Sequence, residues 1–222
     1  MKKIINIIPI ILLIFLFKLA CSFTINEIII KNYNNGLYNS ALIKTLYTFN
    51  FNQPYIVYYN EGNILYKKEN YYEAIEQYNK ALGKKPPHKK ACDIRINLTL
   101  ATIKTINSNE YKTIYNDLED AKNILYENNC ASPTDNSGYS QDAEKLEEEI
   151  KELQKQLNNN SNNNSNNSQE NEENEENENE ENYEDIEKQL KEIEKKANAN
   201  RQSDLSTYEN LGEFSHYSGK KW

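Results

Sequence analysis

A self-repeat of 33 residues constrains the fold of this chain more than any other feature. Six positions of the first copy recur in the second, with identical or similar residues at all but one: Tyr33, Gly36, Tyr38, Ala41, Leu42 and Pro54 become Tyr66, Glu69, Tyr71, Ala74, Ile75 and Pro87. A fixed period of this length is typical of stacked supersecondary units, because one such unit does not bury its own apolar face. The repeat therefore predicts an all-α fold, an α-solenoid, rather than an enzyme.

The second copy carries the signature of a known family. Gly62 and Ala74 are small residues at positions where two helices approach closely, Tyr78 fills the flank of that contact, and Pro86 ends the unit. This pattern resembles the tetratricopeptide repeat, with the best repeat at residues 55–88. Glu61 departs from the family, which usually has an apolar residue there.

We expect about three helix pairs, close to the minimum for a stable solenoid. The solenoid covers residues 24–131, and its first and third pairs are expected at 24–34, 37–50, 92–106 and 109–126. In the third pair, four apolar residues occupy every second position, a pattern that taken alone indicates a strand. They are Ile94, Ile96, Leu98 and Leu100. The apolar run continues to Ile106 and the repeat register requires a helix, so we predict a helix.

The first 23 residues are expected to be a signal peptide or a membrane anchor, with a buried cytosolic helix as the alternative. Two lysines precede a largely apolar run, Ile4–Phe17, which is shorter than the roughly 20 residues of a bilayer span. Three alternatives remain open: cleavage after Ser22, an uncleaved anchor, and a lipoprotein lipidated at Cys21. In each case the positive end stays inside and the chain after about residue 24 is exported.

Residues 158–182 contain only Asn, Ser, Gln and Glu. Nothing there offsets an ordering entropy of about 1–2 kcal/mol per residue, so we predict a disordered acidic linker. It carries eight glutamates, and the rest of the chain has no net charge. This distribution argues against a nucleic-acid-binding surface.

Two apolar seams with alternating three- and four-residue spacing flank this linker. The first, in residues 141–157, consists of Ala143, Leu146, Ile150, Leu153 and Leu157; the second, in residues 183–199, consists of Tyr183, Ile186, Leu190, Ile193 and Ala197. Each is about two heptads long, too short for a stable free coiled coil. The first seam is interpreted as a capping helix on the third pair. The alternative is pairing of the two seams with each other or with a partner chain. A C-terminal tail, residues 200–222, follows.

Cys92 and Cys130 flank the third helix pair, and an antiparallel hairpin places them at the same end. The two helices differ in length by about 9 Å, which unwinding at Asn128-Asn129 would absorb. Because thiols oxidise outside the cytoplasm, we predict a disulfide, with two independent buried thiols as the alternative. Two cysteines and two distant histidines form no ligand cluster, so no metal and no cofactor are expected.

Catalytic signatures are absent from the sequence. His88 follows two prolines and is expected to be a solvated turn residue. The cluster Glu147-Glu148-Glu149 is expected on a solvated helix face, where carboxylates have no reason to acquire shifted pKa values. The sequence therefore indicates a protein that is not an enzyme.

The whole layout is similar to bacterial membrane-anchored tetratricopeptide proteins found alongside von Willebrand A-type domain proteins. The features that carry this resemblance are the N-terminal segment, the stretches Cys92–Leu98 and Asn129–Ala131, and the end Ser218–Trp222. It implies a location in the cell envelope, with envelope proteins, among them von Willebrand A-type domain proteins, as the expected partners.

The resemblance also implies a peptide-binding groove lined by the first helix of each pair. The groove residues it indicates are Tyr59, Asn60, Asn63, Lys67, Arg95 and Asn97. Amide and basic side chains hold a peptide backbone and a terminal carboxylate through charge-assisted hydrogen bonds. Trp222, with the free C-terminal carboxylate, is one candidate ligand. The alternatives are a frayed, unbound end and groove residues that are ordinary solvated helix residues.

These observations predict a non-enzymatic protein–protein interaction scaffold, tethered to the outer face of the cytoplasmic membrane, or secreted if the N-terminal segment is cleaved. The alternative is a passive, extended surface or spacer protein without a defined ligand. Neither nucleic acid nor a small-molecule substrate is expected to bind.

Overall fold

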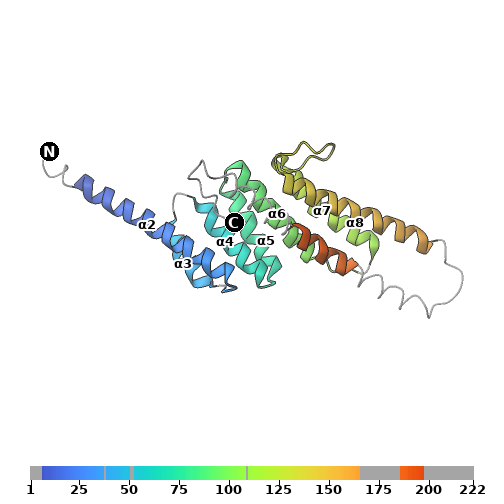
Figure 1. Cartoon of the computed structure of the whole chain (residues 1–222), viewed down its shortest axis with the longest axis horizontal. Coiled ribbons are helices and arrows are strands. Elements are labelled where there is room, and N and C mark those ends of the chain that lie inside the picture. Colours follow the sequence, from blue (N-terminus) through green and yellow to red (C-terminus); the bar gives the residue numbers. More distant parts are fainter. Residues whose placement is uncertain (1–6, 38, 51–52, 109, 166–185, 198–222) are drawn as a thin grey trace. The chain divides into compact units, whose positions relative to one another are not determined.

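The computed structural model describes residues 7–37, 39–50, 53–108, 110–165 and 186–197, and all regular structure in these residues is helical. The predicted all-α class is thereby confirmed. The chain divides into two compact units, Met1–Pro86 (unit 1) and Pro87–Trp222 (unit 2). Unit 1 contains α2 (Ile7–Asn34), α3 (Ser40–Phe49), α4 (Pro54–Lys67) and α5 (Tyr71–Gly83) (Figure 1). Unit 2 contains α6 (His88–Lys104), α7 (Tyr111–Tyr126), the short 3-10 helix η1 (Glu127–Asn129), α8 (Gln141–Ser165) and a helix of residues 186–197.

Helix α2 joins the apolar N-terminal segment directly to the first repeat. We expected a boundary near residue 23, but the helix is continuous over 28 residues. The reason is local: no glycine or proline lies between Ile10 and Asn35, and Pro9 stands in the first turn, where a helix tolerates proline. The segment and the first repeat helix are therefore one element.

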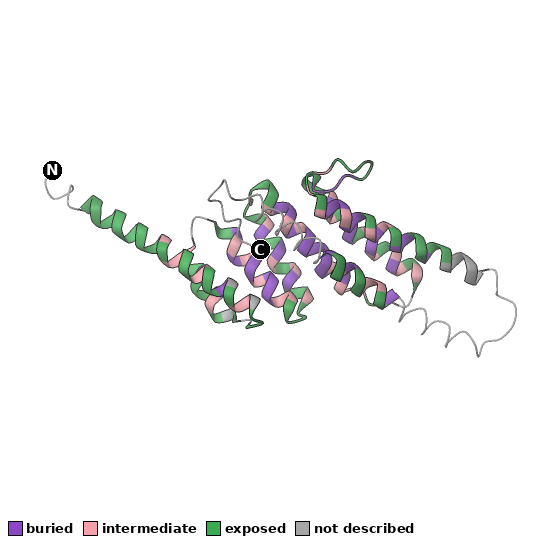
Figure 2. Ribbon diagram, viewed as in Figure 1, coloured by how far each residue is buried: buried purple, intermediate pink, exposed green. Residues whose placement is uncertain are grey.

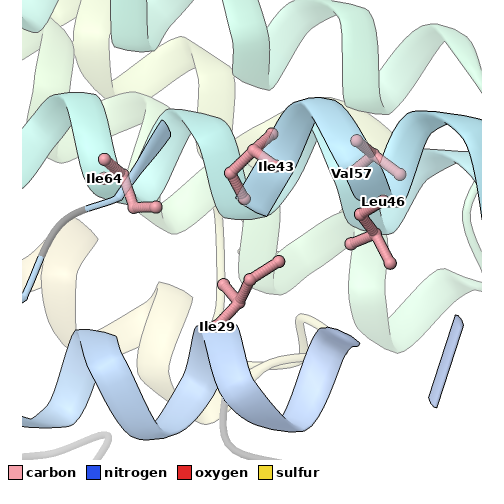
Figure 3. Close-up of a cluster of buried hydrophobic side chains, with 5 residues drawn as sticks. All are labelled: Ile29, Ile43, Leu46, Val57 and Ile64. Atoms are coloured by element: carbon pink, nitrogen blue, oxygen red, sulfur yellow. The ribbon is translucent and has the colours of Figure 1, made fainter. Parts of the chain in front are cut away.

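The core of unit 1 lies where α2, α3 and α4 meet. Figure 3 shows Ile29 of α2 directed toward side chains of α3 and α4. The buried cluster consists of Ile29, Ile43, Leu46, Val57 and Ile64, each at most 3% exposed. Burial of such side chains stabilises a fold by about 1.5–3 kcal/mol each. The C-terminal part of α2, which contains Ile29, therefore belongs to the folded repeat.

Helix α6 is buried on nearly every side. All four alternating residues that resemble a strand pattern lie inside: Ile94, Ile96, Leu98 and Leu100. A helix without a solvent-facing stripe has no amphipathic period, because the polar face that creates the period is missing. This explains why periodicity alone indicated a strand at this helix.

Helix α8 packs along α7, and its apolar seam is buried over its whole length, from Ala143 to Leu157. The helix continues to Ser165, so the first eight residues of the expected linker are helical. A helix that is already nucleated by packing extends at little cost into a polar sequence. The rest of the linker, residues 166–182, and the C-terminal tail lie outside the described residues.

The glutamates of α8 do not all face solvent, which corrects the sequence-based expectation. Glu147 is fully buried, accepts a hydrogen bond from the Tyr126 hydroxyl and pairs with Lys151. Burial raises the pKa of the Glu149 carboxyl. Glu147 lies one position from Leu146 and three from Ile150, so it falls beside the apolar seam and is covered when α8 packs on α7.

Candidate protein-interaction surfaces

The contact between α4 and α5 is built around one glycine. A Cβ atom placed on Gly62 would lie 2.6 Å from the Tyr78 ring, so only glycine permits this approach without movement of the ring. The Tyr78 hydroxyl donates to the Asn63 side-chain oxygen at 2.9 Å, and the ring lies beside that of Tyr59 with centroids 6.1 Å apart. The small-residue position expected from the repeat pattern is therefore a true close contact.

Glu61, the departure from the repeat pattern, has a polar partner on the neighbouring helix. Its carboxylate accepts a hydrogen bond of 2.6 Å from the Tyr47 hydroxyl of α3. Burial and this bond raise the pKa of Tyr47. The Tyr47 ring also meets Tyr58 edge to face at 5.2 Å. A charge is tolerated here because it bonds across the α3–α4 contact instead of entering the core.

Most of the expected groove residues of unit 1 are not open to a ligand. Tyr59, Asn60 and Asn63 are at most 5% exposed, whereas Lys67 is exposed. Asn60 donates to the Asn26 side-chain oxygen of α2 at 2.9 Å. These amides therefore join helices within unit 1, and the prediction that they line an accessible peptide groove is wrong for this structure.

The two groove residues expected in unit 2 are likewise engaged. Arg95 forms an ion pair of 2.9 Å with Glu127 beyond the end of α7, and only 13% of its side chain is exposed. Asn97 is buried. Because α6 is enclosed on nearly all sides, neither position lies on an open surface. Lys67 is thus the only one of the six that remains exposed.

Residues 186–197 cover a surface of unit 2 formed by α6 and α8. The Lys104 ammonium at the end of α6 lies 2.7 Å from the Glu194 carboxylate, with 18% and 25% of the two side chains exposed. The charges of Lys196 and Glu192 also lie near enough to affect the pKa of the Glu149 carboxyl of α8, in opposite directions. Ile186, Ile193 and Ala197 of the second apolar seam are thus buried on the folded chain, whereas Tyr183 lies outside the described residues. Sequence analysis located the seam but gave no signal for Lys104, whose role depends on proximity alone.

One end of unit 2 brings Cys92, Cys130 and His88 together. The two sulfurs form a disulfide with Cα atoms 5.3 Å apart. Both sulfurs and a His88 nitrogen lie within 4.8 Å of one another, so the expectation of a distant histidine is wrong. His88 is exposed, donates to the Asn128 carbonyl at 2.7 Å and stacks on Tyr139. While the disulfide is closed, neither sulfur is a thiolate that a metal would bind.

The loop between η1 and α8 is held by a buried carboxylate. Glu144 is 6% exposed and accepts hydrogen bonds from the backbone amides of Ser132 and Gly138. A Cβ atom on Gly138 would lie 2.6 Å from the Ala131 backbone. Among the described residues of unit 2, Glu144 thus bonds the loop to α8, and Glu147 bonds α7 to α8.

Antiparallel helices that pack pairwise around small residues define a class of helical repeat proteins. The family model that matches this chain is the tetratricopeptide repeat, over residues 55–88. This match covers α4 and α5 and supports the interpretation of the chain as a tetratricopeptide repeat protein, a class that generally mediates protein–protein interaction. No curated protein and no solved structure matches the chain.

Proposed function

We propose that this chain is a non-enzymatic protein–protein interaction scaffold, held at the outer face of a membrane by an uncleaved α2. The tetratricopeptide match over α4 and α5 supports the binding role. The main observation in support of the tether is that the two ends of α2 differ in burial. Its N-terminal part is exposed (Figure 2) and carries apolar side chains, whereas Ile29 near its other end belongs to the unit 1 core.

The length and composition of α2 suit a membrane span or a signal sequence. Its exposed apolar part, from Ile7 to Phe23, is about 25 Å long at 1.5 Å per residue. Ile29 follows only six residues later, a distance of about 9 Å. An anchor that is continuous with the first repeat helix would hold unit 1 next to the membrane surface without an intervening linker.

This tether is tested on membranes from cells that express the full chain. Intact mass of the membrane-bound protein distinguishes an uncleaved anchor from cleavage after Ser22 and from lipidation at Cys21. Protease added to intact cells should degrade residues after α2. Complete protection of these residues from protease until the cells are lysed would rule out the outward orientation. A measured mass equal to that of a chain starting at Phe23 would rule out the uncleaved anchor.

The binding role is tested by affinity capture from detergent-solubilised envelopes with the full chain as bait. Envelope proteins are the expected partners, and the resemblance noted above makes von Willebrand A-type domain proteins the first to examine. Gly62→Trp, which overpacks the α4–α5 contact, should abolish capture of partners that bind unit 1, whereas Gly83→Ala at an open position should not. Capture of the same proteins by both variants would place their binding outside the α4–α5 repeat, and capture of none by the unmodified chain would favour the passive spacer.

A further inference from the structure

The helix of residues 186–197 is attached to unit 2 by few side chains. Three residues of its seam, Ile186, Ile193 and Ala197, are each 5% exposed. The opposite face is exposed and charged: Glu187, Lys188, Lys191, Glu192, Lys195 and Lys196. A free helix of this length is marginal in water, so its order depends on the surface against which it packs.

That surface combines apolar contact with one specific charge. Lys104 of α6 pairs with Glu194, and the negative charge of Glu187 lies near enough to interact with the same ammonium group. Lys104 is therefore a cation that selects an acidic residue next to the central isoleucine, Ile193. A partly buried pair of this kind contributes orientation as well as attraction.

The chain between α8 and this helix is long enough to let the helix leave and return. Twenty residues separate Ser165 from Ile186, and none from 166 to 182 is apolar. A tether of this kind keeps a ligand near its site at an effective concentration on the order of millimolar. Weak contacts are then sufficient for occupancy, and a moderately tight external ligand can compete.

We propose that residues 186–197 are a built-in ligand of the α6/α8 surface, which an external partner displaces. The partner that fits is an amphipathic helix with apolar residues at positions i, i+7 and i+11 and an acidic residue at i+8, as in Ile186, Ile193, Ala197 and Glu194. This inference rests on the proposed scaffold function and names the kind of partner that the scaffold accepts. The competing segment belongs to the same chain.

The first measurement is hydrogen exchange of the full chain in detergent. Amides of residues 186–197 should be protected in the unmodified chain and exposed in Ile193→Asp and in Glu194→Lys. The second variant changes no apolar contact, so it remains informative if the first disturbs folding. Lys188→Gln, at an exposed position with the same change in charge as Ile193→Asp, should keep the protection. Protection of α6, α7 and α8 should be the same in all four proteins.

The second measurement is the binding of a fluorescent peptide of residues 183–199. Chains with Ile193→Asp should bind it at least about ten-fold more tightly than the unmodified chain or Lys188→Gln, because the tethered competitor is removed. Adding Lys104→Glu should weaken binding, and a peptide with Glu194→Lys should restore it. Such a charge exchange would not rescue a merely structural defect.

Three results would overturn the inference: unprotected amides at residues 186–197 in the unmodified chain, equal peptide affinity with and without Ile193→Asp, or no binding to Ile193→Asp at millimolar peptide. If the protection of residues 186–197 is lost on dilution, the helix binds unit 2 of a second copy. That result would also overturn the inference that the helix is a ligand within its own chain. Because the probe is the chain's own helix, these outcomes are independent of whether envelope capture finds a partner.

Discussion

Glu69 and Gly36, the one unlike pair in the 33-residue repeat, share the same left-handed backbone conformation, with φ of 63° and 73°. Their hydrogen bonds also correspond. The Gly36 amide donates to the Tyr33 carbonyl and the Glu69 amide to the Tyr66 carbonyl, each at 3.0 Å. The following amides donate to carbonyls five residues earlier, which completes the turn that ends many helices. The two copies of the repeat therefore have the same backbone geometry at this position, although their side chains differ.

Glu69→Gly is expected to stabilise the fold by about 1 kcal/mol, because glycine adopts positive φ without strain. Gly36→Ala should destabilise it by a similar amount; the site has free space for a Cβ, so the effect is due to backbone strain alone. Thermal unfolding measures both. Gly83→Ala, also in open space but at an ordinary φ, is the control and should be neutral or slightly stabilising. Equal effects of the two alanine substitutions would contradict the assignment.

Gly62→Ala is expected to destabilise unit 1 by about 1–3 kcal/mol, since the new methyl group meets the Tyr78 ring. Tyr78→Leu on its own should also destabilise the unit, because it removes a buried ring and the bond to Asn63. The double variant should lose less than the sum of the two single losses, since the smaller side chain leaves room for the methyl. Strict additivity in chemical denaturation would show that the two residues are not in contact.

Opening the Cys92–Cys130 disulfide is expected to cost about 3–4 kcal/mol by chain-entropy arguments for a sequence separation of 38. Alkylation of the native protein, followed by intact mass, should reveal two more reactive thiols after reduction than before. The double variant Cys92→Ala, Cys130→Ala should unfold at a correspondingly lower temperature. Full alkylation of both residues without reductant would disprove the bond.

The network of Glu119, Lys122 and Gln154 should make the α7–α8 contact sensitive to acid. The hydrogen bond from Lys122, at 2.7 Å, and a second from Gln154 lower the pKa of the Glu119 carboxyl below its ordinary value of 4.5. A depressed pKa contributes stability above the unfolded-state value, and this contribution is lost as the pH falls through the folded-state value.

The test compares thermal unfolding of the unmodified chain and Glu119→Gln over a range of pH. The unmodified chain should be more stable at neutral pH, and the difference should shrink below about pH 4.5. Glu152→Gln removes an exposed carboxylate with only a 3.5 Å ion pair to Lys155 and should show no such trend. A difference between the chain and Glu119→Gln that stays constant with pH would exclude this role for the carboxylate.

Several features were predictable because they depend on neighbours along one helix. The seam from Ala143 to Leu157 follows helical spacing, and all five of its residues are buried. The small position at Gly62 followed from the repeat pattern. The expected groove could not be predicted reliably, because exposure depends on every element that packs around a helix. Asn60 and Asn97 stand at plausible groove positions yet are buried.

The amino-acid sequence by itself determined that the chain is helical, where the apolar seams run and where the two repeat copies correspond, since periodicity and turn chemistry act over a few residues. Only the tertiary structure decided that Lys104 meets Glu194, that His88 lies beside the two sulfurs and that Glu147 is enclosed. Most of these relationships join residues far apart in the chain; His88 and Cys92 are four positions apart on α6, and the disulfide brings the distant Cys130 to them. They arise from the three-dimensional packing of whole helices, which local spacing does not specify.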